Sequence, residues 1–80
     1  MQVIIAYCTV WNYLPRASRV EEEIKAAFSD AIVKKIPGER GQFDISVNGN
    51  VIFSKLNKIG TYIERFPDPG ESVTLLKKAL

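Results

Sequence analysis

The chemistry that this sequence most readily suggests is that of a thiol. Cys8 is the one cysteine of the chain, and Trp11 stands three residues after it. Two cysteines at this spacing form the pair of a dithiol redox centre, whereas a single thiolate can only form a mixed disulfide with another molecule. The other interpretation is that Cys8 is a small buried hydrophobe, a common use of unpaired cysteine. The sequence leaves both interpretations open.

Other site chemistries find little support in the sequence. A chain with one cysteine and no histidine has neither an internal disulfide nor an ordinary structural zinc site. The three glutamates at residues 21–23 are most simply a solvated helix segment. The glycines at residues 38–41 lie in a turn between strands, without the strand-to-helix context of a phosphate-binding loop. We therefore expect no metal and no resident cofactor.

Size and charge narrow the classes of partner. The 80 residues, 46% hydrophobic and 25% charged, are those of one ordinary globular domain. The net charge of +2 is spread along the chain, which argues against nucleic acid. The longest apolar run is far shorter than the roughly 20 residues that span a bilayer. We expect a cytoplasmic protein with no membrane partner, and the oligomeric state is left open.

The first half of the chain predicts a β-α-β unit. Residues 2–7, QVIIAY, are mostly β-branched and aromatic with almost no alternation, as in a central strand buried on both faces. An amphipathic helix follows, starting either at Asn12 as its cap with Pro15 in the first turn, or near Cys8 with a bend at Pro15. Residues 31–36 form a second strand that ends at the Pro37-Gly38 turn. The two strands should be parallel neighbours. The apolar side of the helix is made of Leu14, Ala17, Val20, Ile24, Ala27 and Phe28.

A hairpin is predicted over residues 42–56. Its turn is Asn48-Gly49, a strong hairpin signal. A two-residue turn places Ile45 opposite Ile52 and Phe43 opposite Ser54. Phe53 then faces the other side of the sheet, where it would be partly exposed.

The last helix has a marked start. After a loop over residues 57–67, Asp68 is expected to cap it, with Pro69 at its first position and Glu71 reaching back as in a capping box. Val73, Leu76 and Leu80 form its apolar side.

The order β-α-β-β-β-α, with a cysteine between the first strand and the first helix, resembles a thioredoxin-like fold. The run Gly41-x-Phe43-Asp44-Ile45-x-Val47-x-Gly49-x-Val51-Ile52-x-Ser54-Lys55, with Tyr7-Cys8, Phe28 and Phe66-Pro67, is similar to the selenoprotein W-related, or Rdx-type, proteins. The resemblance implies one α/β domain over residues 1–80. Its four-stranded mixed sheet has the order 2-1-3-4, and both helices lie on one face.

The resemblance also implies a role in thiol redox chemistry. Members of that family carry a second cysteine or a selenocysteine where this chain has Trp11, so dithiol activity is not expected here. Pro15 is a further departure from the family's pattern. Cys8 would be the nucleophile of a monothiol or glutathione-linked reaction, its thiolate stabilised by the start of the helix and by Arg16 or Arg65. The residues expected to form a groove for glutathione or a protein partner are Trp11, Tyr13, Arg16, Arg65, Phe66 and Pro67.

Two other interpretations belong to different classes of protein. One is a non-catalytic binding module with a structural Cys8, which would hold a protein partner through Trp11, Tyr13, Phe66 and the sheet face around Phe53. The other is a double-stranded-RNA-binding domain, suggested by the element order after residue 11. The near-neutral charge and the apolar first strand speak against the RNA interpretation.

Overall fold

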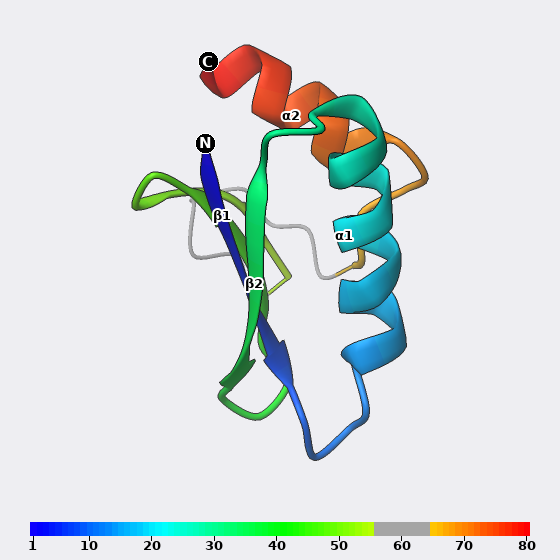
Figure 1. Cartoon of the computed structure of the whole chain (residues 1–80). Coiled ribbons are helices and arrows are strands. Elements are labelled where there is room, and N and C mark those ends of the chain that lie inside the picture. The colour runs from blue at the N-terminus through cyan, green and yellow to red at the C-terminus, as the bar shows by residue number, and fades with distance from the viewer. Residues whose placement is uncertain (56–64) are drawn as a thin grey trace.

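A four-stranded mixed sheet carries both helices on one face (Figure 1). The computed structural model describes residues 1–55 and 65–80. The strands lie in the order β2-β1-β3-β4, as the family resemblance implied. The elements are β1 (Gln2–Cys8), α1 (Leu14–Ala27), β2 (Ile32–Gly38), β3 (Phe43–Val47), β4 (Asn50–Ser54) and α2 (Glu71–Ala79).

The β-α-β unit is confirmed, with β1 and β2 paired in parallel from Gln2 with Ile32 to Cys8 with Gly38. The strand β2 runs two residues beyond its predicted end and includes Pro37, which pairs with Tyr7. Because β2 is an edge strand, the missing N–H of a proline is tolerated there.

The structure decides between the two predicted starts of the first helix, one capped by Asn12 and one near Cys8. The helix begins at Leu14 and holds Pro15 in its first turn. Asn12 is not the cap, because its φ of 55° places it in the left-handed region. The residue at the cap position is Tyr13, and it makes no capping hydrogen bond through its side chain. Asn12 instead closes a tight turn, in which its N–H donates to the carbonyl of Thr9 at 3.2 Å.

The predicted Asn48-Gly49 turn is present, with a positive φ at both residues as a two-residue hairpin requires. The predicted pairing of the two strands is wrong. Ile45 pairs with Phe53, because a bulge makes Ile52 an extra residue in β4. One extra residue turns the rest of β4 over, so Phe53 lies in the core and only 5% of it is exposed.

The same bulge displaces the second predicted pair. Ser54 lies opposite Asp44, and Phe43 pairs with Tyr7 of β1 on its other side.

The start of α2 is partly as predicted. Glu71 reaches back, and its Oε1 accepts a hydrogen bond from the Asp68 N–H at 2.9 Å. Gly70 is the cap, with a φ of 79°, and Asp68 provides no side-chain cap. Leu76 is fully buried, but Leu80 is exposed because it lies beyond the last helical residue, so its predicted place on the apolar side is wrong.

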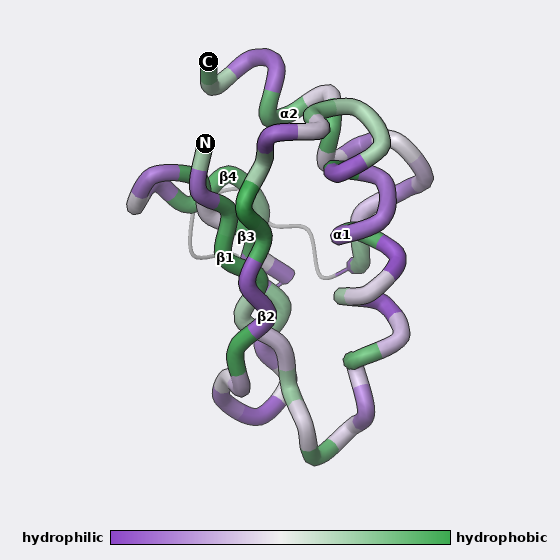
Figure 2. Tube along the Cα trace, viewed as in Figure 1, coloured by the Kyte–Doolittle hydropathy of each residue, from purple (hydrophilic) through white to green (hydrophobic). Residues whose placement is uncertain are grey.

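The core lies between the helices and one face of the sheet, and Figure 2 shows how apolar residues gather along the strands. The strand β1 was expected to be buried on both faces, but only Val3 and Ile5 on its core face are fully buried before Cys8, while Ile4 and Ala6 on the other face are half-buried. Within the described residues no helix is long and apolar enough to cross a membrane. The buried apolar cluster consists of Val3, Ile5, Ala17, Val20, Ile24, Ala31, Phe43, Ile45, Val47, Phe53 and Leu76.

Candidate functional site

Cys8 is the last residue of β1, and the backbone holds it from both sides. Its N–H donates to the carbonyl of Gln42 at 2.8 Å, and its carbonyl accepts from the N–H of Tyr13 at 3.0 Å. No part of Cys8 is exposed to solvent. The thiol is therefore fixed in position and covered.

Backbone N–H groups surround the sulfur. The N–H of Trp11 donates to Cys8 Sγ at 3.4 Å, and the backbone N–H groups of Gly41 and Val10 also favour the thiolate. Burial raises the pKa of the Cys8 thiol, but these three donors and the positive charge of Arg40 together outweigh burial, so the pKa lies below its ordinary value. The sequence predicted that the start of the helix would stabilise the thiolate. The donors belong instead to the turns on either side of Cys8 and not to the first turn of α1.

Trp11 lies against Gly41. A side-chain Cβ built at residue 41 would come within 3.0 Å of Trp11 Cζ3, and the φ of Gly41 is 77°. Both the close approach and the positive φ require glycine there. Trp11 itself is 54% exposed, so it covers Gly41 with one face and presents the rest to solvent.

A row of aromatic rings runs from Trp11 into the core. The centroids of Trp11 and Tyr13 are 6.2 Å apart, those of Tyr13 and Phe66 4.7 Å, and those of Phe66 and Phe43 5.2 Å. Each contact is edge to face, an arrangement that aromatic pairs favour. Trp11, Tyr13 and Phe66, which sequence reasoning placed in one groove, are thus brought together.

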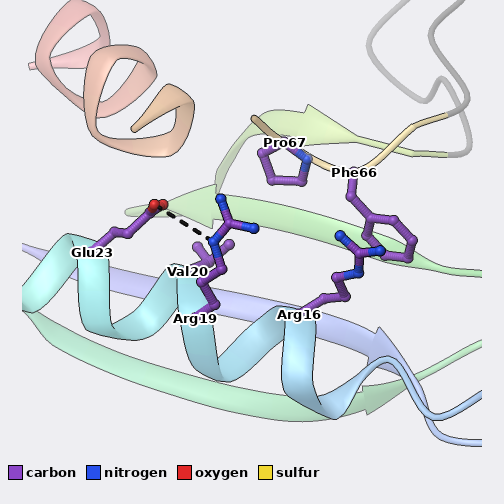
Figure 3. Close-up of a pocket in the computed structure, with 6 residues that line it drawn as sticks. All are labelled: Arg16, Arg19, Val20, Glu23, Phe66 and Pro67. Carbon is purple, nitrogen blue, oxygen red and sulfur yellow. Dashed lines mark ion pairs between the residues drawn. The ribbon is translucent and has the colours of Figure 1, made fainter. Parts of the chain in front are cut away.

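Cationic side chains lie over these rings. The guanidinium of Arg16 is 4.6 Å from the centroid of Phe66, and Lys55 Nζ is 5.7 Å from the centroids of both Tyr13 and Phe66. Figure 3 shows Arg16 and Arg19 of α1 facing Phe66 and Pro67 across a small hollow. Arg16 and Pro67 therefore lie beside Phe66, as the sequence predicted, and their part in a binding groove stays a prediction.

Arg65 has a different place from the one predicted. Its guanidinium donates to both carboxylate oxygens of Glu71, at 2.6 and 2.9 Å, and to the carbonyl of Phe66 at 3.0 Å. It anchors the segment before α2. The charge that lowers the pKa of Cys8 comes from Arg40, which sequence reasoning missed together with Gly41. A signal existed, since the predicted pairing of the first and third strands places residues 39–42 beside Cys8.

The part of the chain that the structure describes contains no cluster of three or more side chains suited to a metal ion. The chemistry available at the site is that of a thiolate beside an aromatic and cationic surface.

Comparison with known proteins identifies the group to which this chain belongs. The family model described as the Rdx family matches residues 2–78. The chain belongs to the Rdx family. Cys8 is the one cysteine of this member, and Trp11 stands three residues after it, at the position where the resemblance implied a second redox residue.

Two solved structures support the assignment of this Rdx protein. A protein from Bordetella parapertussis is 26% identical, with 99% of this chain and 96% of that chain covered and a TM-score of 0.84. A selenoprotein W-related protein from Vibrio cholerae is 25% identical, with 98% and 94% covered and a TM-score of 0.82. No curated protein matches the chain. The matches extend over almost the whole length of both chains. The fold of this chain is therefore the one found in these structures, and it is consistent with the family match.

Proposed function

We propose that this Rdx protein acts as a monothiol, with Cys8 as the nucleophile in exchange with glutathione or with a protein disulfide. The observation that supports this most strongly is the hydrogen bond from the Trp11 N–H to Cys8 Sγ at 3.4 Å, beside which the backbone N–H groups of Gly41 and Val10 also lower the pKa of the thiol. A cysteine that served only as a small hydrophobe would gain little from such donors, whereas a thiolate is stabilised by each of them.

The exchange needs only one protein thiol. The Cys8 thiolate attacks one sulfur of an incoming disulfide, the disulfide bond breaks, and the leaving thiolate departs while a mixed disulfide forms on Cys8. A second thiol, such as free glutathione, then attacks the mixed disulfide and releases the Cys8 thiolate. The second thiol is thereby joined to the sulfur that Cys8 had held, and a further external thiolate attacks that disulfide, frees the partner sulfur and leaves the two external thiols joined as a disulfide. The partner disulfide is then reduced at the expense of two external thiols, so no resolving cysteine is required at residue 11.

Access to the sulfur is the condition that this mechanism must meet. Cys8 has no exposed surface, and the turn at residues 9–12 covers it with Trp11 on top of Gly41. We infer that this turn opens for exchange. Opening breaks the backbone bond between Thr9 and Asn12, the bond from the Trp11 N–H to Cys8 Sγ and the packing of Trp11 on Gly41. Val10 and Trp11 are both exposed, so the opening disrupts little of the core.

Oxidised glutathione provides the test. Native protein incubated with it should gain one glutathionyl group, detected by mass spectrometry, and lose it on addition of reduced glutathione. The Cys8→Ser variant should gain none. A native protein that stays unmodified under conditions in which the denatured chain is modified would contradict the proposal.

Full burial of Cys8 and the 54% exposure of Trp11 favour a second candidate, a binding module with a structural cysteine. Its binding surface would be Trp11, Tyr13 and Phe66. The sheet face around Phe53 no longer belongs to it, because Phe53 is in the core.

A further inference from the structure

Three large apolar side chains are exposed beside the thiol. Val10 is 67% exposed, Trp11 54% and Leu14 42%, and they follow one another through the turn and into the first turn of α1. Tryptophan in particular is enriched among residues that anchor protein partners. The rings of Trp11, Tyr13 and Phe66 continue this surface, with neighbouring centroids 6.2 and 4.7 Å apart.

Some cations of the described chain are held in ion pairs, whereas those beside this row are not, a property that they share with Lys34, Lys77 and Lys78. Within residues 1–55 and 65–80, Arg19 is paired with Glu23, Lys25 and Lys35 with Glu21, and Arg65 with Glu71. The cations at the row have no carboxylate of the described chain within ion-pair distance. They are Arg16, Arg40 and Lys55.

Two of these three cations lie over rings of the row, and the third is the sequence neighbour of a residue that contacts the row. The guanidinium of Arg16 lies over Phe66 and Lys55 Nζ lies near Tyr13, so ring contacts help to hold their positions. Arg40 precedes Gly41, on which Trp11 packs, and its charge acts on Cys8. The positive groups thus flank the apolar row at both ends.

We propose that this surface, formed by Val10, Trp11, Tyr13, Leu14, Phe66, Arg16, Arg40 and Lys55, binds an acidic segment of a partner protein that carries an apolar residue between its carboxylates. The apolar side chain packs on Trp11 and Leu14, and the carboxylates pair with the cations on either side. Complementary charge of this kind selects partners and speeds their association. The binding goes beyond the thiol chemistry and does not require it.

The test uses Trp11, the one tryptophan of the chain, as its probe. The Cys8→Ser variant is titrated with a synthetic peptide of four glutamates around one leucine, and the fluorescence maximum is followed. A shift to shorter wavelength that saturates, and that weakens with added salt, is expected. Since Cys8 is absent, the result is independent of the proposed exchange reaction, and the glutathione adduct experiment is independent of this one.

Charge reversals locate the peptide. In the same Cys8→Ser background, Arg16→Glu and Lys55→Glu should each raise the dissociation constant by about fivefold. Lys77→Glu, which makes the same charge change in the last turn of α2, should leave it unchanged. Three results would overturn the proposal: no fluorescence shift, equal binding of a peptide with lysines in place of the glutamates, or equal weakening by Lys77→Glu. Equally strong binding of glutathione would also reject a peptide segment as the ligand.

Discussion

The indole ring of Trp11 packs on Gly41, whose backbone N–H lowers the pKa of Cys8. Trp11 also donates its own N–H to that sulfur, at 3.4 Å. One residue thus supplies a hydrogen bond to the thiol and packs its ring against the glycine on the other side of it. In this Rdx protein the position that would complete a redox pair instead shapes the surroundings of the remaining cysteine.

Replacing Trp11 by alanine should expose Cys8. Protection of a covered group depends on the free energy of local opening, so alkylation of the native thiol should become about tenfold faster or more. Val10→Ala removes a side chain from the same turn that is 67% exposed, and should leave the rate unchanged. Equal alkylation rates in Trp11→Ala and the wild type would show that Trp11 does not control access.

Comparing Gly41→Ala with Gly49→Ala distinguishes the energetic cost of a strained backbone from the cost of a steric clash with a neighbouring side chain. Both residues have a positive φ, so each alanine should cost about 1–2 kcal/mol of the free energy of unfolding. Only at residue 41 does the new Cβ meet a neighbour, Trp11 at 3.0 Å, whereas nothing lies within 4 Å at Gly49. Urea denaturation should therefore show a larger loss for Gly41→Ala, together with altered alkylation of Cys8. Equal losses would mean that Trp11 moves aside freely.

The bulge in β4 can be tested by truncating its neighbours. Phe53→Ala should lower the free energy of unfolding by about 3 kcal/mol, because it leaves a cavity beside Ile45. Val51→Ala, at a side chain that is 42% exposed, should lower it by less than about 1 kcal/mol. The register without a bulge places Val51 and Phe53 on the same face, and it predicts similar effects. Denaturant titrations of both variants distinguish the two registers.

The order of the elements and of the strands could be predicted because each rests on local patterns and on a resemblance over the whole chain. The register of β4 could not, because the bulge depends on Phe53 gaining a place under the helices, which is a tertiary effect. Asn12 is a similar case. An asparagine side chain suits the cap of a helix. Here, however, the Asn12 N–H closes a turn onto the Thr9 carbonyl, and the backbone of Asn12 lies in the left-handed region.

The sequence predicted which residues lie together at the site better than it predicted what each of them contacts. Cys8, Trp11, Tyr13 and Phe66 do gather, but burial of the thiol is a property of packing that spacing does not reveal. Arg65 was predicted to stabilise the Cys8 thiolate. In the structure its guanidinium forms an ion pair with Glu71.

The pair of Arg65 and Glu71 predicts a pH dependence of stability. The hydrogen bond from Arg65 lowers the pKa of Glu71 below its ordinary value of 4.5, against the effect of burial. A lowered pKa in the folded state adds stability that is complete above pH 4.5 and is lost as the pH falls through the lowered value.

Glu71→Gln removes this contribution. Its melting temperature should therefore lie about 3 °C below that of the wild type at pH 7, and the difference should vanish in acid. Glu22→Gln, on the exposed side of α1, controls for the loss of one negative charge. A difference between Glu71→Gln and the wild type that stays constant as the pH falls would refute this account of the pair.

The rate of Cys8 alkylation as a function of pH tests the central claim most directly. All labelling reports on this residue because the chain has one cysteine. A thiolate held by the N–H groups of Val10, Trp11 and Gly41 predicts that the rate of the native protein rises at a lower pH than that of the denatured chain. A native profile whose rise falls at the same pH as in the denatured chain, or at a higher one, would contradict a stabilised thiolate and leave Cys8 as a core residue.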